Sequence, residues 1–431
     1  MKENKKIGVA LSGGGYRATI YHLGTLKKLN DLNLLDKVDI ISTNSGGSIT
    51  GAVYGLYGND FKNFERIIRK GVKSSIIKGV LTSTIFLRFL LFSIATLFAV
   101  FYFIFSSYAW IGLLIFIVYI FLFLIFQFNI LPLSVINEEM YNKYFFKGKC
   151  LSDFSSDKTI AINTTNAETG KPFTFSKNKM SDSSYTYPKD KGSPIIFKHN
   201  KFPIARAVAA STSVPFVFTP IRINKKYFNN PNDYKRASPK LIDGGIYDNQ
   251  GVHKLVWSNS SYRCDIILVS DAGNIIPFKN TYRNVISLLI RTSDIFMDRI
   301  KNFQMIQLIY NKDNKNEVAY QSLGFDIENS ISHFVENIQK GYISDDVIHL
   351  HNIQKSDIKN EKWKEIIEYL GEKIDYKKIV KNANTKEQLK LARSVGTNLT
   401  SLSDAKINAL VNHAYVITEI QLQLYCPTLF K

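Results

Sequence analysis

The sequence predicts an α/β protein of three layers, in which a mainly parallel sheet has helices on both faces and a two-helix transmembrane hairpin interrupts the fold. Short apolar strand-like runs alternate with segments of helical periodicity, and Gly/Ser-rich turns separate them. One long central run has no charged residue at all. The 431 residues are enough for one large domain or two of ordinary size.

The first elements alternate strand and helix. We expect strands at residues 6–11 and 38–42, each followed by a Gly/Ser-rich turn, and helices over residues 17–29 and 48–57. Further strands are expected at 159–163 and 264–269. The C-terminal region reads as helices over 361–370 and 404–424. This order favours a parallel sheet, because parallel strands need a crossover that is usually a helix.

The central run, residues 89–137, contains no Lys, Arg, Asp, Glu or His. One crossing of a bilayer takes about 20 helical residues, so this run is long enough for two. We expect spans near 87–105 and 109–128, with a turn at residues 106–108. The alternative is a buried helical hairpin in a soluble core, but such a hairpin usually keeps a polar face.

Basic residues flank the run on both sides, with Arg66, Lys78 and Arg88 before it and Lys143 and Lys147 after it. The positive-inside rule then places both flanks in the cytoplasm, so that they can fold together. We therefore expect an integral membrane protein with a cytoplasmic catalytic domain. The predicted parts are 1–80 and 138–350 for the catalytic domain, 81–137 for the hairpin, and 351–431 for a C-terminal helical region.

A glycine-rich turn, Ser12-Gly13-Gly14-Gly15-Tyr16-Arg17, stands between the first strand and the first helix. Glycines there leave backbone N–H groups open to a ligand, and the helix N-terminus adds positive potential. The turn therefore suits an anion, either a phosphate or a transient oxyanion. It matches a dinucleotide-binding motif only in part, and it lacks the Gly-Lys-Ser/Thr of a P-loop.

A second turn of this kind contains Ser45, in Thr43-Asn44-Ser45-Gly46-Gly47-Ser48. A nucleophile elbow, G-x-S-x-G, places a serine on a tight strand-to-helix turn with small neighbours. Gly47 fits that pattern, but Thr43 stands where the first glycine belongs. An ordinary Gly/Ser-rich turn that caps a helix is the alternative interpretation.

A third motif delivers an acid, Asp243, after the apolar pair Leu241-Ile242 and before Gly244-Gly245. The glycines leave room around the carboxylate at the end of an expected strand. The alternative is an Asx turn, which is common for Asp-Gly.

In this order and spacing the three motifs resemble the patatin-like phospholipase family, over roughly residues 6–80 and 150–275. The segment 205–216, Ala-Arg-Ala-Val-Ala-Ala-Ser-Thr-Ser-Val-Pro-Phe, also resembles the stretch that precedes the family's aspartate. The resemblance implies a Ser–Asp dyad, with Ser45 as nucleophile and Asp243 as base. Ala18 departs from the family pattern, because a glycine is usual there.

The resemblance also implies an oxyanion hole made by the glycine loop and the elbow, with Gly13, Gly14, Gly15 and Gly46 as its residues. Arg17 has two interpretations, either holding the loop by hydrogen bonds or meeting a lipid phosphate. We favour the first.

A histidine-assisted triad is the rival arrangement, with His22 or His253 as the candidate, although no motif places either of them. Three widely spaced cysteines argue against a disulfide-stapled domain and a Cys-based zinc site. The pair His349 and His351 has no further ligands beside it. We therefore expect no metal and no cofactor.

The charge excess is concentrated after the central run. Residues 141–240 contain 18 Lys and Arg against 6 Asp and Glu. Basic residues next to a membrane attract an anionic leaflet, so we expect membrane lipids as partners. Nucleic acid is not expected, because no recognised nucleic-acid-binding motif accompanies the charge. An ordinary solvated surface remains open.

Together these features predict a membrane-anchored serine lipid acyl hydrolase that cleaves acyl esters of membrane phospholipids. Three alternatives remain open: an acyltransferase with the same dyad, a catalytically silent scaffold of the same fold, and a nucleotide-binding membrane protein that uses the glycine-rich turn. Thr43 and Ala18 are the residues that favour the scaffold.

Overall fold

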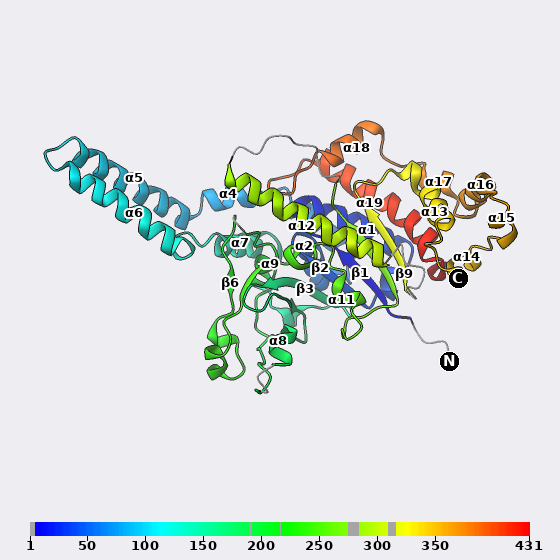
Figure 1. Cartoon of the computed structure of the whole chain (residues 1–431), viewed down its shortest axis with the longest axis horizontal. Helices are drawn as coiled ribbons and strands as arrows, with labels where there is room; N and C mark the ends of the chain where they lie inside the picture. The colour runs from blue at the N-terminus through cyan, green and yellow to red at the C-terminus, as the bar shows by residue number, and fades with distance from the viewer. Residues whose placement is uncertain (1–4, 189–191, 216, 275–283, 309–315) are drawn as a thin grey trace.

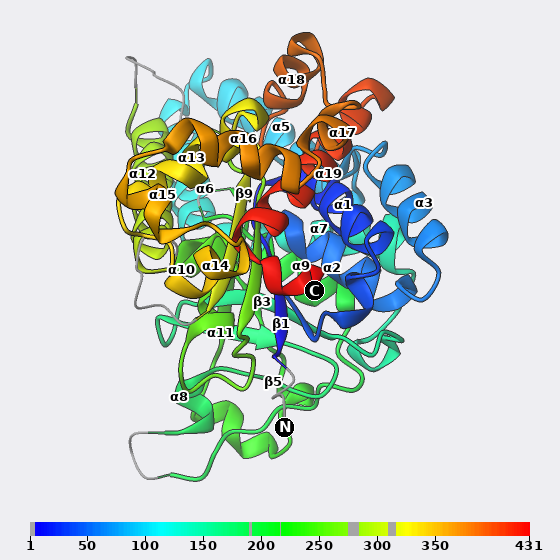
Figure 2. The ribbon, with the colours of Figure 1, turned by 90° about the vertical axis from the view of Figure 1, so that its right-hand side faces the viewer.

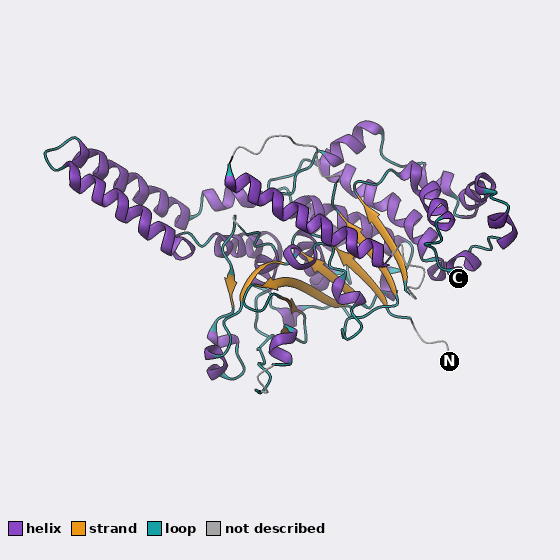
Figure 3. Cartoon of the chain, viewed as in Figure 1, coloured by secondary structure: helices purple, strands orange, loops and turns teal. Residues whose placement is uncertain are grey.

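A mixed, mostly parallel sheet forms the centre of the computed structural model, which describes residues 5–188, 192–215, 217–274, 284–308 and 316–431. The strand order is β5-β4-β3-β2-β1-β8-β9, and β7 pairs with both β3 and β6. Figure 3 shows the strands in orange among the surrounding helices. The parallel strands are β1 (Ile7–Leu11), β2 (Ile40–Asn44), β3 (Thr159–Asn166), β8 (Ile266–Asp271) and β9 (Glu317–Ser322). The antiparallel strands are β4 (Lys171–Phe175), β5 (Met180–Ser181), β6 (Ile221–Arg222) and β7 (Lys240–Asp243).

Helices cover both faces of this sheet, as Figure 2 shows. Side chains alternate along a strand, so Val9 and Leu11 of β1 join the core on one face while Ala10 joins the core on the other. The first face packs against α1 (Gly15–Asp31), α2 (Gly46–Tyr57) and α19 (Asp404–Tyr425). The second face packs against α11 (His253–Val256) and α12 (Val285–Leu308). The expected α/β architecture is confirmed.

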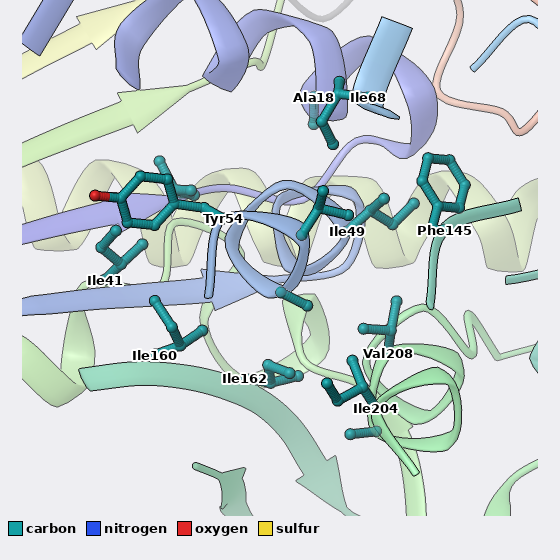
Figure 4. Close-up of a cluster of buried hydrophobic side chains, with 14 of the residues drawn as sticks. Ala18, Ile41, Ile49, Tyr54, Ile68, Phe145, Ile160, Ile162, Ile204 and Val208 are labelled. Carbon is teal, nitrogen blue, oxygen red and sulfur yellow. The ribbon is translucent and has the colours of Figure 1, made fainter. Parts of the chain in front are cut away.

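The larger core lies between the sheet and α2. Figure 4 shows Ile41 of β2 and Ile160 of β3 facing Ile49 of α2, with Val208 of α9 (Ile204–Ser211) beside them. All four side chains are at most 1% exposed. Burying an aliphatic side chain of this size contributes roughly 1.5–3 kcal/mol, so this contact fixes α2, and the turn before it, on the sheet.

The uncharged run forms two helices, α5 (Thr84–Ile104) and α6 (Ala109–Ile130), which pack on each other and project away from the sheet (Figure 1). Only Val100 and Gly112 of these helices are buried. A helix of 21 residues is about 31 Å long, close to the ~30 Å of a bilayer core. Both helices are therefore long and apolar enough to cross a membrane. We call α5 and α6 the hairpin.

Short helices lie on either side of the hairpin, α4 (Ile76–Leu81) before it and α7 (Leu133–Tyr141) after it. The other helices are α3 (Phe61–Gly71), α8 (Ser183–Thr186), α10 (Gly245–Asp248), α13 (Ser330–Gln339), α14 (Asp345–Leu350), α15 (Lys355–Lys359), α16 (Trp363–Lys373), α17 (Tyr376–Val380) and α18 (Lys386–Arg393). A second core joins α13 and α14 to α16 and α19. Helices on both sides of the expected boundary at residue 350 thus share one core, and the division into domains stays a prediction.

Candidate active site

Ser45 occupies the turn between β2 and α2 in a backbone conformation that is rare for a side-chain-bearing residue. Its φ is 46° and its ψ is −121°. Such a conformation costs on the order of 1–3 kcal/mol and persists only where the surroundings enforce it. A nucleophile elbow holds its serine on a strained turn of this kind, which lifts the hydroxyl above the end of the sheet.

The glycines after Ser45 allow the turn to pack closely. A Cβ at Gly46 would collide with the backbone of Gly15, and a Cβ at Gly47 would collide with the carbonyls of Leu11 and Ser12. Because neither residue has a Cβ, the two turns come close enough for the Gly47 N–H to donate to the Ser12 carbonyl at 3.1 Å. The elbow and the glycine loop therefore form one unit, although about thirty residues separate them in the chain.

Thr43 is accommodated at the position where the elbow pattern has a glycine. Its methyl group fills the space left by Gly51, one turn into α2, where a Cβ would collide with it. Its hydroxyl lies 3.0 Å from the Ser48 hydroxyl and 3.2 Å from the Ala161 carbonyl. The missing side chain at Gly51 provides the space that a glycine at position 43 would otherwise provide, so Thr43 does not prevent the elbow from forming.

The Ser45 hydroxyl donates to Oδ2 of Asp243 at 2.8 Å. The structure thus brings together two residues that are 198 positions apart in the chain. Asp243 is 5% exposed, and its burial raises the pKa of the carboxyl from 3.8 to about 6, against the opposing hydrogen bonds from Gly245 and Ser45. A carboxylate with that pKa can accept a proton near neutral pH.

The backbone of Asp243 is held from two sides. Strand β7 pairs antiparallel with β3, with Asp243 opposite Thr164, and the Thr165 hydroxyl donates to the Asp243 carbonyl at 3.0 Å. On the other side, the Asp243 N–H donates to the Ser213 carbonyl at 2.9 Å. The aspartate therefore sits at a fixed edge of the sheet, beside the end of α9.

Ser211 is a site residue that sequence reasoning did not single out. Its hydroxyl oxygen accepts the N–H of Ser45 at 2.9 Å and donates to the Asn163 carbonyl at 2.6 Å. It is fully buried at the end of α9. The only sequence signal was a run of small hydroxyl residues, Ser211-Thr212-Ser213, after an alanine-rich helix. Phe216, which ends that motif, lies outside the described residues.

The glycine loop differs from expectation at one position. The N–H of Gly13 donates to the Asn249 carbonyl at 2.9 Å, so Gly13 has no free donor for an oxyanion and is removed from the set. The N–H groups of Gly14, Gly15 and Gly46 have no acceptor within the described part of the chain. Gly14 and Gly15 have φ values of 138° and 57°, a region that suits glycine. Gly46 belongs to the elbow, and the backbone of Gly15 packs directly against it.

Arg17 holds the loop. Its guanidinium donates to the Val395 carbonyl at 3.2 Å, and burial lowers the pKa of this group. This contact agrees with the first of the two interpretations of Arg17.

Neither candidate histidine contacts the pair among the residues that the structure describes. His22 is fully buried, with Nε2 2.9 Å from the Ser12 carbonyl and Nδ1 2.8 Å from the Ser270 hydroxyl, and burial lowers its pKa to about 4. His253 stacks on Trp257, and burial lowers its pKa as well. His22 therefore supports the glycine loop as a neutral imidazole.

We find no cluster of three or more His, Cys, Asp or Glu side chains suited to a metal ion in the described ranges. His349 belongs to α14, and His351 directly follows that helix. The His351 Nε2 lies 2.8 Å from the Leu424 carbonyl, so this nitrogen contacts the backbone of the chain.

The chain matches the family model of patatin-like phospholipases over residues 9–256. A stretch of 48 residues is 44% identical to the putative meiotic phospholipase SPO1 of Saccharomyces cerevisiae, covering 11% of this chain and 8% of the yeast protein. Among solved structures, VipD from Legionella pneumophila is similar with a TM-score of 0.33 and 14% identity, covering 96% of this chain and 92% of VipD. Human GIVD cytosolic phospholipase A2, in complex with a fluorophosphonate inhibitor and terbium chloride, is similar with a TM-score of 0.48 and 11% identity. The match covers 100% of this chain and 60% of the human chain. The family match spans more than half of the sequence and includes all three motifs, and the chain therefore belongs to the patatin-like phospholipases, a family of carboxylic ester hydrolases.

Proposed function

We propose that this protein is a membrane-anchored lipid acyl hydrolase in which Ser45 is the nucleophile and Asp243 the base. One observation carries the proposal: a serine on a strained strand-to-helix turn donates its hydroxyl to a buried carboxylate at 2.8 Å. A catalytically silent scaffold would have no need to keep Ser45 in so costly a conformation.

In the first step the Ser45 oxygen attacks the carbonyl carbon of an acyl ester, and its proton passes to Asp243. The carbonyl oxygen becomes an oxyanion, and the free N–H groups of Gly14, Gly15 and Gly46 are the donors that would stabilise it. The tetrahedral intermediate then expels the alcohol, which takes the proton from Asp243. An acyl group remains bound to Ser45.

In the second step Asp243, again ionised, takes a proton from water, and the resulting hydroxide attacks the acyl-enzyme. The fatty acid leaves, and the proton returns to the Ser45 oxygen. An alcohol in place of water would give acyl transfer with the same two residues. We take hydrolysis as the function.

The hairpin supports a membrane as the place of reaction. Its side chains are apolar and largely exposed, which is unfavourable in water and favourable in lipid. Val214, directly after Ser213, which holds Asp243, is 42% exposed, and Val217 nearby is 48% exposed. The active site and the hairpin therefore meet at one end of the molecule. The basic residues on both flanks of the hairpin favour the cytoplasmic leaflet as the one that this end meets.

A basic hollow of about 1100 Å³ supports anionic lipids as partners. Its lining includes Lys179, Lys198, Lys201 and Lys226, together with the exposed Ile196. Among the residues that the structure describes, no acidic side chain lines it and none of the four lysines forms an ion pair. Basic groups near an anionic leaflet contribute about 1 kcal/mol each to binding.

Labelling with a fluorophosphonate tests the proposal, because this reagent phosphonylates an activated serine. Wild-type protein in phospholipid vesicles should be labelled at Ser45 and should release fatty acid. Ser45→Ala should do neither, while Ser48→Ala, three residues further on, should still be labelled at Ser45. Wild-type protein that resists labelling and releases no fatty acid would favour the scaffold. Fatty acid recovered on an added alcohol instead of water would favour the acyltransferase.

A further inference from the structure

The two ends of the hairpin each contact a different half of the candidate active site. We define the first root as residues 74–81, which lead into α5, and the second root as residues 133–141, which follow α6. Figure 1 shows their helices, α4 and α7, side by side at the base of the hairpin. The first root contacts the glycine loop, and the second root contacts the segment that holds the dyad.

The first root contacts the glycine loop through Tyr16, the residue after Gly15. The Tyr16 hydroxyl donates to the Ser74 carbonyl at 3.0 Å, and the ring is fully buried. The Tyr16 N–H donates to the Asn398 carbonyl at 2.9 Å, and a Cβ at Gly15 would collide with the Asn398 backbone. Tyr16 therefore fixes the loop that provides two of the three free donors.

A second hydrogen bond joins residues 398–399, which contact Tyr16, to α4. The Ile76 N–H donates to the Leu399 carbonyl at 3.1 Å, one residue after Asn398. The loop is thus bound to the first root directly through Ser74 and indirectly through residues 398–399. A shift of α4 along its axis would move the glycine loop with it.

The second root contacts the dyad through Ser134, the second residue of α7. Its hydroxyl donates to the Thr219 carbonyl at 2.5 Å and lies 2.9 Å from the Ser213 hydroxyl, which donates to the Ala209 carbonyl at 2.6 Å. Its N–H donates to the Thr219 hydroxyl at 3.3 Å. At the other end of α7, the Tyr141 hydroxyl donates to the Thr212 hydroxyl at 3.1 Å. Ser134 and Tyr141 are both fully buried.

One partner of α7, Ser213, also holds the dyad. The Ser213 carbonyl accepts the Asp243 N–H at 2.9 Å. Two residues earlier, the Ser211 hydroxyl oxygen accepts the Ser45 N–H at 2.9 Å. Ser213 is therefore the one residue between Ser134 and Asp243, and the second root reaches the base of the reaction through its contact with Ser213.

The two roots also pack on each other. Gly79 of α4 lies against Met140 of α7, where a Cβ at Gly79 would collide with the methionine side chain. Neither root is more than a few residues from a hairpin helix, since α5 begins at Thr84 and α6 ends at Ile130. The position of the hairpin helices is therefore transmitted to α4 and α7 with little intervening chain.

We infer that the hairpin roots set the spacing between the oxyanion donors and the dyad, with Tyr16 and Ser134 as positioning residues. The inference rests on the proposed function. Oxyanion donors act at about 2.7–3.1 Å from the developing charge, and a misplacement of 1 Å can cost about 10² in rate. A hairpin seated in a bilayer would hold both halves in register.

The test compares full-length variants in phospholipid vesicles, with a soluble short-chain ester as substrate so that substrate binding to lipid does not intervene. Tyr16→Phe and Ser134→Ala each remove one hydroxyl, and Tyr141→Phe removes the second contact of α7. The matched control is Ser93→Ala, which removes a 2.8 Å hydroxyl pair between Ser93 and Tyr119 inside the hairpin. We expect kcat and the rate of fluorophosphonate labelling to fall at least about tenfold in Tyr16→Phe and Ser134→Ala, with KM unchanged.

Wild-type kcat in all three root variants, with wild-type melting temperatures, would overturn the inference. An equal loss in Ser93→Ala would overturn it too, because the effect would then belong to the hairpin as a whole. If Ser134→Ala does not fold, Tyr16→Phe and Tyr141→Phe decide the question by the same criteria. Activity that survives Ser45→Ala would instead reject the proposed function, which keeps the two failures apart.

Discussion

Oδ1 of Asp243 accepts the N–H of Gly245 at 2.7 Å, and this bond fixes the rotation of the carboxylate so that Oδ2 faces Ser45. Gly245, two residues after the aspartate, is therefore part of the site geometry. A side chain at Gly245 would lie within 3.0 Å of the same Oδ1. In the Asp-Gly-Gly sequence, Oδ2 of the carboxylate therefore faces the nucleophile, while Oδ1 accepts a backbone hydrogen bond.

Asp243→Asn should lower turnover and raise stability together. The amide keeps the size and hydrogen-bonding reach of the carboxylate but cannot accept the serine proton, so kcat should fall at least about 10². The pKa of Asp243 rises from 3.8 to about 6 on folding, so its ionised form costs roughly 3 kcal/mol at pH 7. The variant should gain about that much in free energy of unfolding at pH 7 and almost nothing at pH 4, measured by denaturant titration.

The control for the dyad is a pair of histidine variants. His253→Ala should keep most of the activity. His22→Ala should lose stability, because it removes contacts to Ser12 and Ser270, but its folded fraction should remain active. Either variant, folded yet as inactive as Ser45→Ala, would replace the dyad by a triad.

The pH dependence of kcat/KM should report Asp243. Burial raises its pKa to about 6, and only the ionised carboxylate can accept a proton. Activity on an uncharged ester should therefore rise with pH, reach half its maximum near pH 6 and level off above pH 7. A half-maximum near pH 4, with a flat profile from pH 5 to 8, would exclude Asp243 as a base with a raised pKa and would point to His22, whose pKa is lowered to about 4.

Gly51→Ala should destabilise the protein through Thr43. The new methyl group would collide with the Thr43 methyl group, whose position is fixed by the bonds of the Thr43 hydroxyl. Overpacking of this kind costs about 1–3 kcal/mol. The double variant Thr43→Ser/Gly51→Ala should recover most of the loss, because serine has no methyl group there. Equal unfolding free energies for Gly51→Ala and wild type would contradict this account of the elbow.

The hairpin should keep the protein in membranes after washing with high salt and with carbonate, since apolar helices rather than charges would hold it. Replacing residues 87–128 by a short Gly/Ser linker should release a folded domain into solution, measured by fractionation and circular dichroism. Release of the full-length protein by salt alone would refute the membrane span. Unfolding of the shortened protein would mean that the hairpin packs into the core.

The basic hollow should make activity depend on anionic lipid. Turnover on mixed vesicles should rise with the anionic fraction and fall with salt, because charges are screened beyond about 8 Å at physiological ionic strength. Lys198→Gln/Lys201→Gln should lose much of that dependence, whereas Lys377→Gln/Lys378→Gln, on α17, should keep it. Equal activity of wild type on neutral and anionic vesicles at every salt concentration would remove the docking role.

The local helices, strands and motifs could be predicted from the sequence alone. Strands β1 and β2, helices α1 and α2 and the two hairpin helices follow the expected positions within a few residues, because each depends on short-range periodicity or on an uncharged run. The elbow at Ser45 and the acid at Asp243 were visible for the same reason, since glycines beside a reactive side chain mark tight turns. The resemblance then joined three motifs that are each unspecific alone.

Which groups meet in the site depends on how the chain packs in three dimensions. The Ser211 hydroxyl accepts the Ser45 N–H across 166 residues of sequence. The Gly13 N–H donates to the Asn249 carbonyl across 236 residues. Gly51 makes room for Thr43 because one turn of helix brings them together on the sheet. The contacts of Tyr16 and Ser134 with the hairpin roots arise in the same way. Such pairings follow from how strands and helices pack in three dimensions, and no local spacing in the chain encodes them.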